Sequence, residues 1–216
     1  MNEPLASPAA RARVLAELGY DAVAERYLAL VARSEGDPRL GFLDDLAARL
    51  PDGAELLDLG CGAGRPNAER LGRRFRVTGV DVSGRQLELA RAAVPGAAFL
   101  RADMTEVDFE AGSFDAVVAL YSIAHVPREQ HAALFERIAR WLRPGGLLLA
   151  SLGCGDTPGA VEQDWLGAAM FFSSHPADVN RELLAGAGFE LLHDEPIAMR
   201  EDGREATFQW VLARVG

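Results

Sequence analysis

Leu56-Leu57-Asp58-Leu59-Gly60-Cys61-Gly62-Ala63-Gly64-Arg65-Pro66 is the stretch that decides the fold of this chain. Its first half is a short apolar run, which is typical of a buried parallel strand. Its second half carries three glycines at alternate positions, which let the backbone turn sharply and approach a ligand because no Cβ stands in the way. Pro66 suits the first turn of a helix. The stretch therefore predicts the strand, tight turn and helix N-terminus that open a nucleotide-binding βαβ unit.

A second apolar run, residues 76–81, ends in a carboxylate. Asp81 follows Gly60 by 21 positions, which is the approximate separation at which an acidic residue meets a ribose diol in such units. The glycine spacing narrows the class of nucleotide ligand further. A dinucleotide site favours Gly-x-Gly-x-x-Gly, whereas this chain has Gly60, Gly62 and Gly64 followed by Arg65. A dinucleotide is therefore disfavoured.

Five signatures in the correct order resemble the class I S-adenosylmethionine-dependent methyltransferases. The first is the acidic-x-Gly-x-Gly-x-Gly run at 58–64, and the second is Asp81, which sits where the family places its ribose carboxylate. Arg101-Ala102-Asp103-Met104 resembles the segment that holds the adenine. Residues 113–120 resemble the family's fourth strand, and residues 142–149 resemble the turn into its fifth. The glycine turn alone would be a weak signal, and the ordered set is a specific one.

The alternation of strands and helices predicts a parallel sheet that is covered on both faces, within one α/β domain over residues 1–216. The resemblance implies a Rossmann-like, doubly wound, seven-stranded sheet, mostly parallel with one antiparallel strand near the C-terminus. Two successive helical patterns between residues 8 and 31 belong to an expected N-terminal helical cap, residues 1–50. Residues 153–176 break the alternation and are expected to form a lid-like insertion.

The resemblance also implies which residues hold S-adenosylmethionine. Asp58 would anchor the glycine turn, whose backbone approaches the methionine part. Asp81 would accept both ribose hydroxyls, because a carboxylate offers two oxygens to two donors. Val82 and Met104 would enclose the adenine while Asp103 takes its amino group. The alternative for Asp81 and Asp103 is a solvated loop carboxylate. The expected cofactor-binding set is Tyr20, Tyr27, Asp58, Gly60, Gly62, Gly64, Asp81, Val82, Asp103, Met104 and Leu120.

The two tyrosines of that set come from residues 20–27, which resemble the signature Tyr-Asp-x-x-Ala-x-x-Tyr of many small-molecule methyltransferases. In those relatives the N-terminal helices lie over the cofactor as part of a lid. A tyrosine hydroxyl there could reach the cofactor's carboxylate while its ring excludes water. The alternative is that both rings are half-buried packing residues of an amphipathic helix.

His125 is the expected catalytic and acceptor-side residue, because it leaves the fourth strand at the carboxyl edge of the sheet. Its unperturbed pKa of about 6.5 suits a base that takes a proton from an acceptor. The alternative is a histidine that only fixes the loop. The expected substrate-binding residues are His125, Trp165, Met170, Phe171 and His175. For those in the insertion, the alternative is a place in the hydrophobic core.

The formal charge of −10 argues against nucleic acid as a partner, because phosphate binding needs a basic surface. No apolar run approaches the roughly 18 residues of a membrane span and no signal pattern opens the chain, so a cytoplasmic location is expected. Cys61 and Cys154 give no metal-ligand spacing, and no Asp/Asn cluster suggests a magnesium site. We therefore expect no metal, and the sequence leaves the oligomeric state open.

The sequence thus predicts an S-adenosylmethionine-dependent methyltransferase that acts on a small molecule by direct in-line transfer. Whether an oxygen, a nitrogen or a carbon is methylated is not determined. Two alternatives remain at this point. One is a nicotinamide-dependent oxidoreductase of the same architecture, which the glycine spacing disfavours, and the other is a non-catalytic S-adenosylmethionine-binding partner protein.

Overall fold

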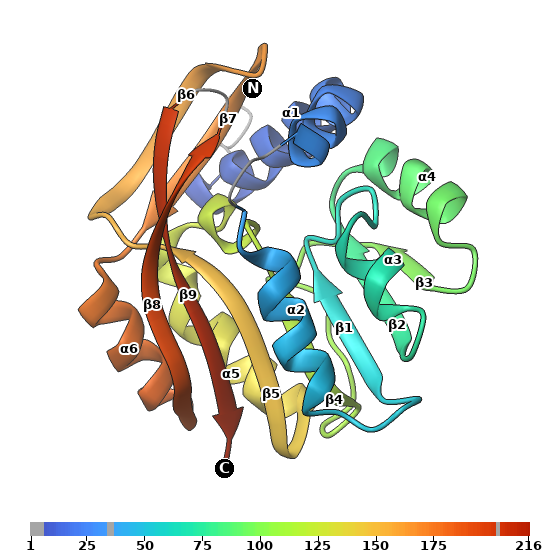
Figure 1. Ribbon diagram of the computed structural model, residues 1–216. Helices are drawn as coiled ribbons and strands as arrows, with labels where there is room; N and C mark the ends of the chain where they lie inside the picture. The colour runs from blue at the N-terminus through green and yellow to red at the C-terminus, as the bar shows by residue number, and fades with distance from the viewer. Residues whose placement is uncertain (1–6, 34–36, 202–203) are drawn as a thin grey trace, which may run out of the picture.

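The strands expected from the sequence form the centre of the computed structural model, which describes residues 7–33, 37–201 and 204–216 (Figure 1). The strands are β1 (Glu55–Leu59), β2 (Arg76–Asp81), β3 (Ala98–Arg101), β4 (Phe114–Ala119), β5 (Leu142–Gly153), β6 (Thr157–Trp165), β7 (Ala168–Ser174), β8 (Phe189–Glu201) and β9 (Arg204–Val215). The helices are α1 (Pro8–Arg33), α2 (Arg39–Ala48), α3 (Asn67–Leu71), α4 (Gly84–Ala93), α5 (His131–Trp141) and α6 (Ala177–Gly186), with the 3₁₀ turns η1 (Ile123–His125) and η2 (Arg128–Gln130).

Seven strands form one sheet in the order β3-β2-β1-β4-β5-β9-β8. Strand β1 pairs in parallel with β2 and with β4, and β4 pairs in parallel with β5. Strand β9 is antiparallel to both of its neighbours, β5 and β8. The strand order reverses between β1 and β4, and ligands of such sheets bind at the carboxyl ends of the strands at this point. The predicted doubly wound, mostly parallel sheet with one antiparallel strand near the C-terminus is confirmed.

Both faces of the sheet are buried, because side chains of successive residues in a strand point to opposite sides. On one face, Leu57 and Leu59 of β1 belong to a buried cluster with α5 and α6. On the other face, Leu56 belongs to a cluster with α2 and α3. The helix residues that fill these clusters are Leu134, Phe135, Ile138, Trp141 and Leu184 on the first face, and Leu43, Leu46, Ala68 and Leu71 on the second.

The carboxyl ends of the parallel strands are covered by α1 and by the β6–β7 hairpin, which lie at the same end of the molecule (Figure 1). Helix α1 packs closely on β7 at Gly19, where a Cβ would lie only 2.7 Å from Met170 Cε and 3.0 Å from the carbonyl oxygen of Ala169. Residues 153–176, expected as a lid-like insertion, therefore contain an antiparallel hairpin against the N-terminal helix.

The N-terminal segment differs from the sequence prediction, because one continuous helix, α1, replaces the two helical patterns expected between residues 8 and 31. Gly19 lies in its interior and costs about 1 kcal/mol relative to alanine, but it does not break the helix. Its missing side chain is what lets the helix lie against β7. A tertiary contact thus explains a glycine in the interior of this helix.

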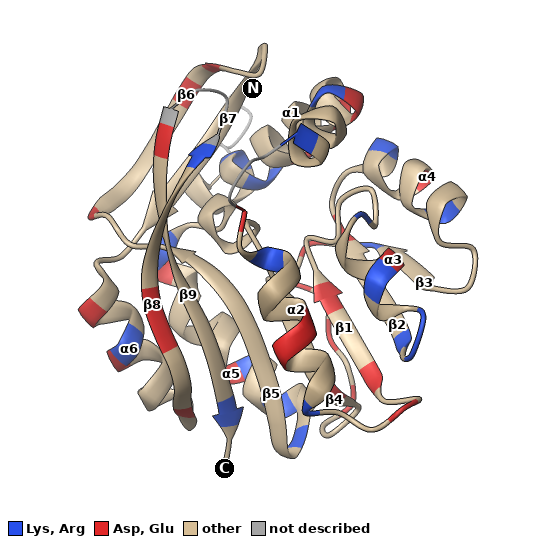
Figure 2. Cartoon of the chain, in the orientation of Figure 1, with Lys and Arg blue, Asp and Glu red and all other residues tan. Residues whose placement is uncertain are grey.

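Helix α1 is also fixed at the opposite side, where it contacts the β2–α4 junction and the end of β3. Asp21 accepts hydrogen bonds from the Ser83 hydroxyl and from the backbone N–H of Arg85, and Arg101 forms an ion pair with Glu17 at 2.7 Å. Figure 2 shows acidic and basic residues on both α1 and α4, and Arg85 of α4 forms an ion pair with Glu25 of α1. Exposed ion pairs contribute about 0–1 kcal/mol each. We infer that they set the position of α1 more than the stability of the fold.

Candidate active site

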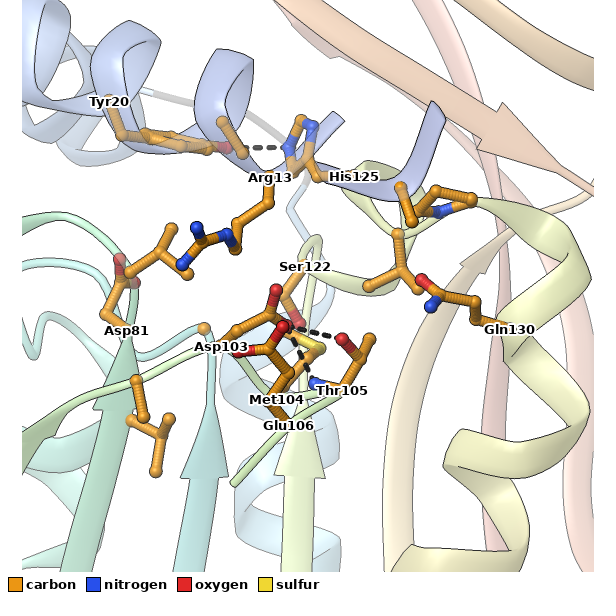
Figure 3. Close-up of a pocket in the computed structure, with 18 of the residues that line it drawn as sticks. Arg13, Tyr20, Asp81, Asp103, Met104, Thr105, Glu106, Ser122, His125 and Gln130 are labelled. Carbon is orange, nitrogen blue, oxygen red and sulfur yellow. Dashed lines mark hydrogen bonds between the residues drawn. The ribbon is translucent and has the colours of Figure 1, made fainter. Parts of the chain in front are cut away.

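A cavity of about 350 Å³ opens between the carboxyl ends of the strands and the underside of α1. This volume falls in the range of about 300–1,000 Å³ typical of small-molecule sites. Its wall combines residues from α1, the β1–α3 turn, the end of β2, the segment after β3 and the segment after β4. The lining residues include Arg13, Tyr20, Tyr27, Gly60, Gly62, Asp81, Val82, Asp103, Met104, Thr105, Leu120, Tyr121, Ser122, His125 and Gln130 (Figure 3).

The floor of the cavity is the glycine turn after β1, which is held against two neighbouring strands. Backbone N–H groups of Gly60 and Cys61 donate to the carbonyl oxygen of Val80 at 2.8 and 3.0 Å. The Ser122 hydroxyl donates to the carbonyl oxygen of Leu59 at 2.7 Å. Gly60 has φ +73°, and a Cβ there would lie 2.3 Å from the Cβ of Ser122. Only glycine fits this position, so the turn presents bare backbone to the cavity.

Asp81 stands at the end of β2 with its carboxylate fixed by backbone donors. Oδ2 accepts from the N–H of Gly62 at 2.8 Å, and Oδ1 accepts from the N–H of Ser83 at 2.9 Å. Burial raises the pKa of Asp81 to about 6, although these two N–H groups act in the opposite direction. Each carboxylate oxygen has about two acceptor positions, so one on each remains for a ligand beyond these donors. This geometry and the bare turn fit a bound nucleoside with a diol.

Asp103 and Met104 form the wall beyond β3. Asp103 Oδ1 accepts from the backbone N–H and from the hydroxyl of Thr105, both at 2.8 Å, which fixes the orientation of its carboxylate. The Met104 methyl group lies 3.4 Å from the position that a Cβ of Gly60 would take. The segment expected to hold the adenine is therefore next to the glycine turn, as Figure 3 shows for Asp103 and Met104 beside Ser122.

His125 and Tyr20 close the cavity from above. The Tyr20 hydroxyl lies 2.9 Å from His125 Nε2, and His125 Nδ1 lies 2.8 Å from the carbonyl oxygen of Phe171. Burial lowers the pKa of His125 to about 4. The ring of Tyr27 packs edge-on against Tyr20 at 5.2 Å between centroids. Both ring nitrogens of His125 thus have a hydrogen-bond partner within the protein. In this arrangement His125 cannot take a proton directly from an acceptor.

The structure brings most of the sequence-predicted site residues into one cavity wall. These are Tyr20, Tyr27, Gly60, Gly62, Asp81, Val82, Asp103, Met104, Leu120 and His125. Their segments lie far apart in the sequence, and the parallel sheet gathers them because its strands all end at the same edge. Their roles toward a cofactor remain predictions.

Two predicted cofactor residues lie outside the lining. Gly64 faces α4 instead, because the position of its Cβ would be 3.4 Å from Ala90 and from Val94. Asp58 is 1% exposed and belongs to the strand beneath the turn rather than to the cavity wall. The alternating glycines therefore serve two purposes, with Gly60 and Gly62 lining the cavity and Gly64 allowing α4 to approach.

The predicted substrate-binding residues of residues 153–176 are also absent from the lining. The Met170 side chain is fully buried against Gly19, and Phe171 contributes its carbonyl oxygen to His125. His175 Nε2 lies 3.1 Å from the carbonyl oxygen of Arg128. Trp165 packs edge-on against Tyr20 and at a tilt against Tyr27, at 5.4 and 5.6 Å between centroids. The hairpin supports the residues that line the cavity and does not itself supply the wall.

Several lining residues were not predicted from the sequence, among them Arg13, Ser122 and Gln130. Arg13 extends from α1 into the cavity, and Gln130 lies across from it beyond His125 (Figure 3). Arg13 precedes Tyr20 by seven residues, which is two helical turns, so both lie on one helix face. That spacing could have identified Arg13. Ser122 follows the fourth strand directly, but its contact with Gly60 depends on the strand order.

The buried Asp58 gives a stability prediction. Burial raises the pKa of this carboxyl group from 3.8 to about 7, although the neighbouring Asn67 side chain acts in the opposite direction. The native state therefore holds a proton that the unfolded state lacks between these values, and stability falls as pH rises from about 4 to 7. The shift corresponds to about 4 kcal/mol at most. We expect Asp58→Asn to remove most of this dependence.

The measurement is thermal unfolding of both proteins at pH 5 and pH 8. Asp58→Asn should become more stable relative to wild type as the pH rises between these values, because Asp81, His125 and His131 contribute to both proteins and only the Asp58 contribution is absent from the variant. Asp164→Asn, which makes the same change on the exposed face of β6, should follow the wild type. Parallel curves for wild type and Asp58→Asn would contradict the prediction.

Within the part of the chain that the structure describes, no three His, Cys, Asp or Glu side chains come together as a metal site requires. Among the same residues, no helix combines the length and the apolar character needed to cross a membrane.

Comparison with known proteins gives a consistent result. A family model described as a methyltransferase domain matches residues 56–146. Trans-aconitate 2-methyltransferase of Azoarcus sp. (strain BH72) is 38% identical over 116 residues, which is 52% of this chain and 45% of that protein. The 27-O-demethylrifamycin SV methyltransferase of Amycolatopsis mediterranei is 38% identical over 132 residues, covering 56% of this chain and 47% of its own. The chain spans about half the length of these curated relatives.

Solved structures share the fold at lower identity. The 1,6-didemethyltoxoflavin-N1-methyltransferase of Burkholderia thailandensis, solved with 1,6-didemethyltoxoflavin and S-adenosylhomocysteine, has a TM-score of 0.73 and 22% identity, and covers 100% of this chain and 93% of its own. The (4+2)-cyclase SpnF has a TM-score of 0.68 and 21% identity, over 93% of this chain and 95% of that one. The fold therefore also carries chemistry other than methyl transfer.

Proposed function

The chain belongs to the class I S-adenosylmethionine-dependent methyltransferase family, and from this premise we propose that it transfers a methyl group from S-adenosylmethionine to a small organic acceptor. The observation that carries the proposal is the cavity at the point where the strand order reverses. There the bare turn at Gly60, the fixed carboxylate of Asp81 and the wall at Met104 meet beneath α1. A nicotinamide-dependent oxidoreductase has no comparable support from the family assignment.

Residues of this chain would hold the cofactor from three sides. The backbone of Gly60 and Gly62 would receive its methionine part, Asp81 would accept the two ribose hydroxyls, and Asp103 would take the amino group of the adenine between Val82 and Met104. S-adenosylmethionine supplies a methyl group that is already activated on a positively charged sulfur. The protein's own task is then to align the acceptor and exclude water, which can lower a barrier by about 7–11 kcal/mol.

Three observations support a small acceptor. The cavity is about 350 Å³, and α1 and the β6–β7 hairpin cover it, so we propose that they act as cap and lid. The relatives named for trans-aconitate and for a rifamycin act, by their names, on small molecules. The formal charge of −10 argues against a nucleic-acid acceptor, because phosphate binding requires a basic surface.

Calorimetry with S-adenosylmethionine and S-adenosylhomocysteine tests the cofactor assignment. We expect one binding site for each, and the absence of binding by both would end the proposal. A metabolite extract of the source organism, incubated with the protein and methyl-labelled S-adenosylmethionine, should then yield a labelled small product. Binding without any labelled product would instead favour a non-catalytic cofactor-binding protein.

A further inference from the structure

Tyr20 and His125 form a hydrogen-bonded pair in the cavity wall, although 105 positions separate them in the chain. The Tyr20 hydroxyl comes from the underside of α1, and His125 comes from η1, directly after β4. Figure 3 shows the two side chains meeting at the top of the cavity, above Ser122. A third element completes the arrangement, because His125 Nδ1 lies 2.8 Å from the carbonyl oxygen of Phe171 in β7.

The direction of these hydrogen bonds follows from the carbonyl group. A carbonyl oxygen carries no proton, so His125 Nδ1 must carry one and donate it to Phe171. In a neutral imidazole the other nitrogen, Nε2, is then an acceptor, and the Tyr20 hydroxyl donates to it. The neutral form is the one that this environment stabilises, since burial lowers the pKa of His125 to about 4. The Tyr20 oxygen, with its proton committed to His125, can accept a proton from the cavity side.

This direction of the hydrogen bond conflicts with the expectation that the Tyr20 hydroxyl donates to the carboxylate of the cofactor. While its hydroxyl donates to His125, the proton is not available to the carboxylate of a cofactor. His125 has a parallel restriction, because its one basic nitrogen is covered by Tyr20 and cannot contact an acceptor directly. The group that meets the acceptor is therefore the tyrosine, with the histidine behind it.

We propose that Tyr20 and His125 form a proton relay for acceptors that carry their reactive proton on a hydroxyl group, with Tyr20 as the catalytic residue in contact with the acceptor. The inference rests on the proposed methyl transfer. The proton of the acceptor hydroxyl passes to Tyr20 Oη as the proton of Tyr20 passes to the lone pair of His125 Nε2. The electron pair left on the acceptor oxygen forms the new bond to the methyl carbon, and the electrons of the broken carbon–sulfur bond stay on sulfur. His125 later returns the proton to solvent by the reverse path.

The groups around the Tyr20–His125 pair do not stabilise a permanently charged His125. They are compatible with an imidazolium that forms only during the reaction. The groups facing the His125 ring within the described structure are the rings of Tyr20, Trp165 and Phe172, at 5.2, 6.2 and 4.9 Å between centroids, and the carbonyl of Phe171. These rings shield the pair from water without providing a counter-ion. The imidazole gains its positive charge in the step in which the bound sulfonium loses one, so the total charge of the site is unchanged.

A purely structural role, in which the pair only holds α1 against η1, makes different predictions. Tyr20→Phe keeps the ring packing and removes only the oxygen. His125→Asn places an amide nitrogen near the position of Nδ1, which preserves a donor for Phe171, and removes Nε2. His193→Asn is the matched control, because that histidine lies on β8 against the ring of Phe42, away from the cavity.

The first measurement does not depend on turnover. Long-range proton–nitrogen NMR of the protein with ¹⁵N-labelled histidine, bound to S-adenosylhomocysteine, should show His125 protonated at Nδ1 and neutral down to about pH 5. Tyr20→Phe should shift the Nε2 resonance, and His193→Asn should leave it unchanged. A proton on Nε2 in the wild type would overturn the relay.

The second measurement uses phenol and 4-nitrophenol as probe acceptors, because the nitro group makes the second far more acidic. With phenol, Tyr20→Phe and His125→Asn should each lower kcat about 10²- to 10⁴-fold, and the double variant should be no worse than either. With 4-nitrophenol, which loses its proton without help, the loss should be under tenfold. The affinity for S-adenosylhomocysteine should stay within threefold of the wild-type value.

Three outcomes would overturn the relay. They are an equal loss with both phenols, a large loss of S-adenosylhomocysteine affinity in Tyr20→Phe, and no turnover of either phenol by a wild-type protein that binds S-adenosylhomocysteine. Failure of the proposed function is distinguishable from all of these. In that case the wild type would bind neither S-adenosylmethionine nor S-adenosylhomocysteine, whatever the NMR signals of His125 show.

Discussion

Replacing Gly60 with alanine is expected to abolish detectable S-adenosylhomocysteine binding and to lower the melting temperature by about 5–15 °C. A methyl group at this position would lie 2.3 Å from the Cβ of Ser122, and φ is +73°. The strained backbone costs about 1–3 kcal/mol and overpacking costs a similar amount, so the expected loss of stability is about 2–6 kcal/mol. Calorimetry and thermal unfolding measure the two effects separately.

Gly41→Ala provides the matched control, because the same change in α2 meets nothing within 4 Å. Alanine is the better helix former, so this variant should gain about 0.5–1 kcal/mol and bind S-adenosylhomocysteine normally. A double variant, Gly60→Ala with Ser122→Gly, removes the atom that is struck and should recover part of the lost stability. Normal binding by Gly60→Ala alone would show that the turn does not form the ligand cradle.

Replacing Asp81 with alanine is expected to weaken S-adenosylhomocysteine binding by at least 100-fold. The carboxylate would form two charge-assisted hydrogen bonds with the ribose, each contributing about 1.5–3 kcal/mol. Their combined loss exceeds the approximately 2.8 kcal/mol that a 100-fold change in dissociation constant requires. Titration calorimetry at pH 7.5 is the measurement, and an unchanged affinity would show that the ribose is held elsewhere.

The pH dependence of S-adenosylhomocysteine binding by the wild type provides a second test of the role of Asp81. The ionised carboxylate is the form that accepts two hydroxyls, and its pKa is about 6. Affinity should therefore be present above pH 6 and fall as the pH decreases through that value, by about tenfold at pH 5. Asp81→Ala should show no such transition. Asp81→Asn keeps the shape of the side chain, and its unfolding curve distinguishes lost ribose contacts from a disturbed turn at Gly62 and Ser83.

Asp44→Ala is the surface control, because that carboxylate pairs with Arg70 between α2 and α3 and is half exposed. Exposed pairs contribute about 0–1 kcal/mol, so neither binding nor melting temperature should change much. Comparable losses in Asp44→Ala and Asp81→Ala would mean that the binding assay reports general instability.

The candidate site was predictable where its residues follow local rules. Gly60 and Asp81 stand at the ends of two successive apolar runs, and in a parallel sheet such ends meet at one edge. The same kind of pattern did not show which element a neighbouring residue would face. Gly64 belongs to the same alternation but faces α4, and Met170 of the hairpin is buried against Gly19. A glycine or an apolar residue in such a pattern indicates that the position is closely packed. The pattern does not indicate which other part of the chain packs against it.

The sequence by itself determined the fold class, the cradle turn and the acidic residue of the second strand, because backbone conformation and strand periodicity depend on residues close together in the chain. Only the tertiary structure decided that Tyr20 donates to His125, that Phe171 orients the imidazole and that burial raises the pKa of Asp58 to about 7. These properties depend on contacts between segments as much as 105 positions apart. Hydrogen-bond direction and pKa follow from such contacts and from burial, which a local sequence pattern does not encode.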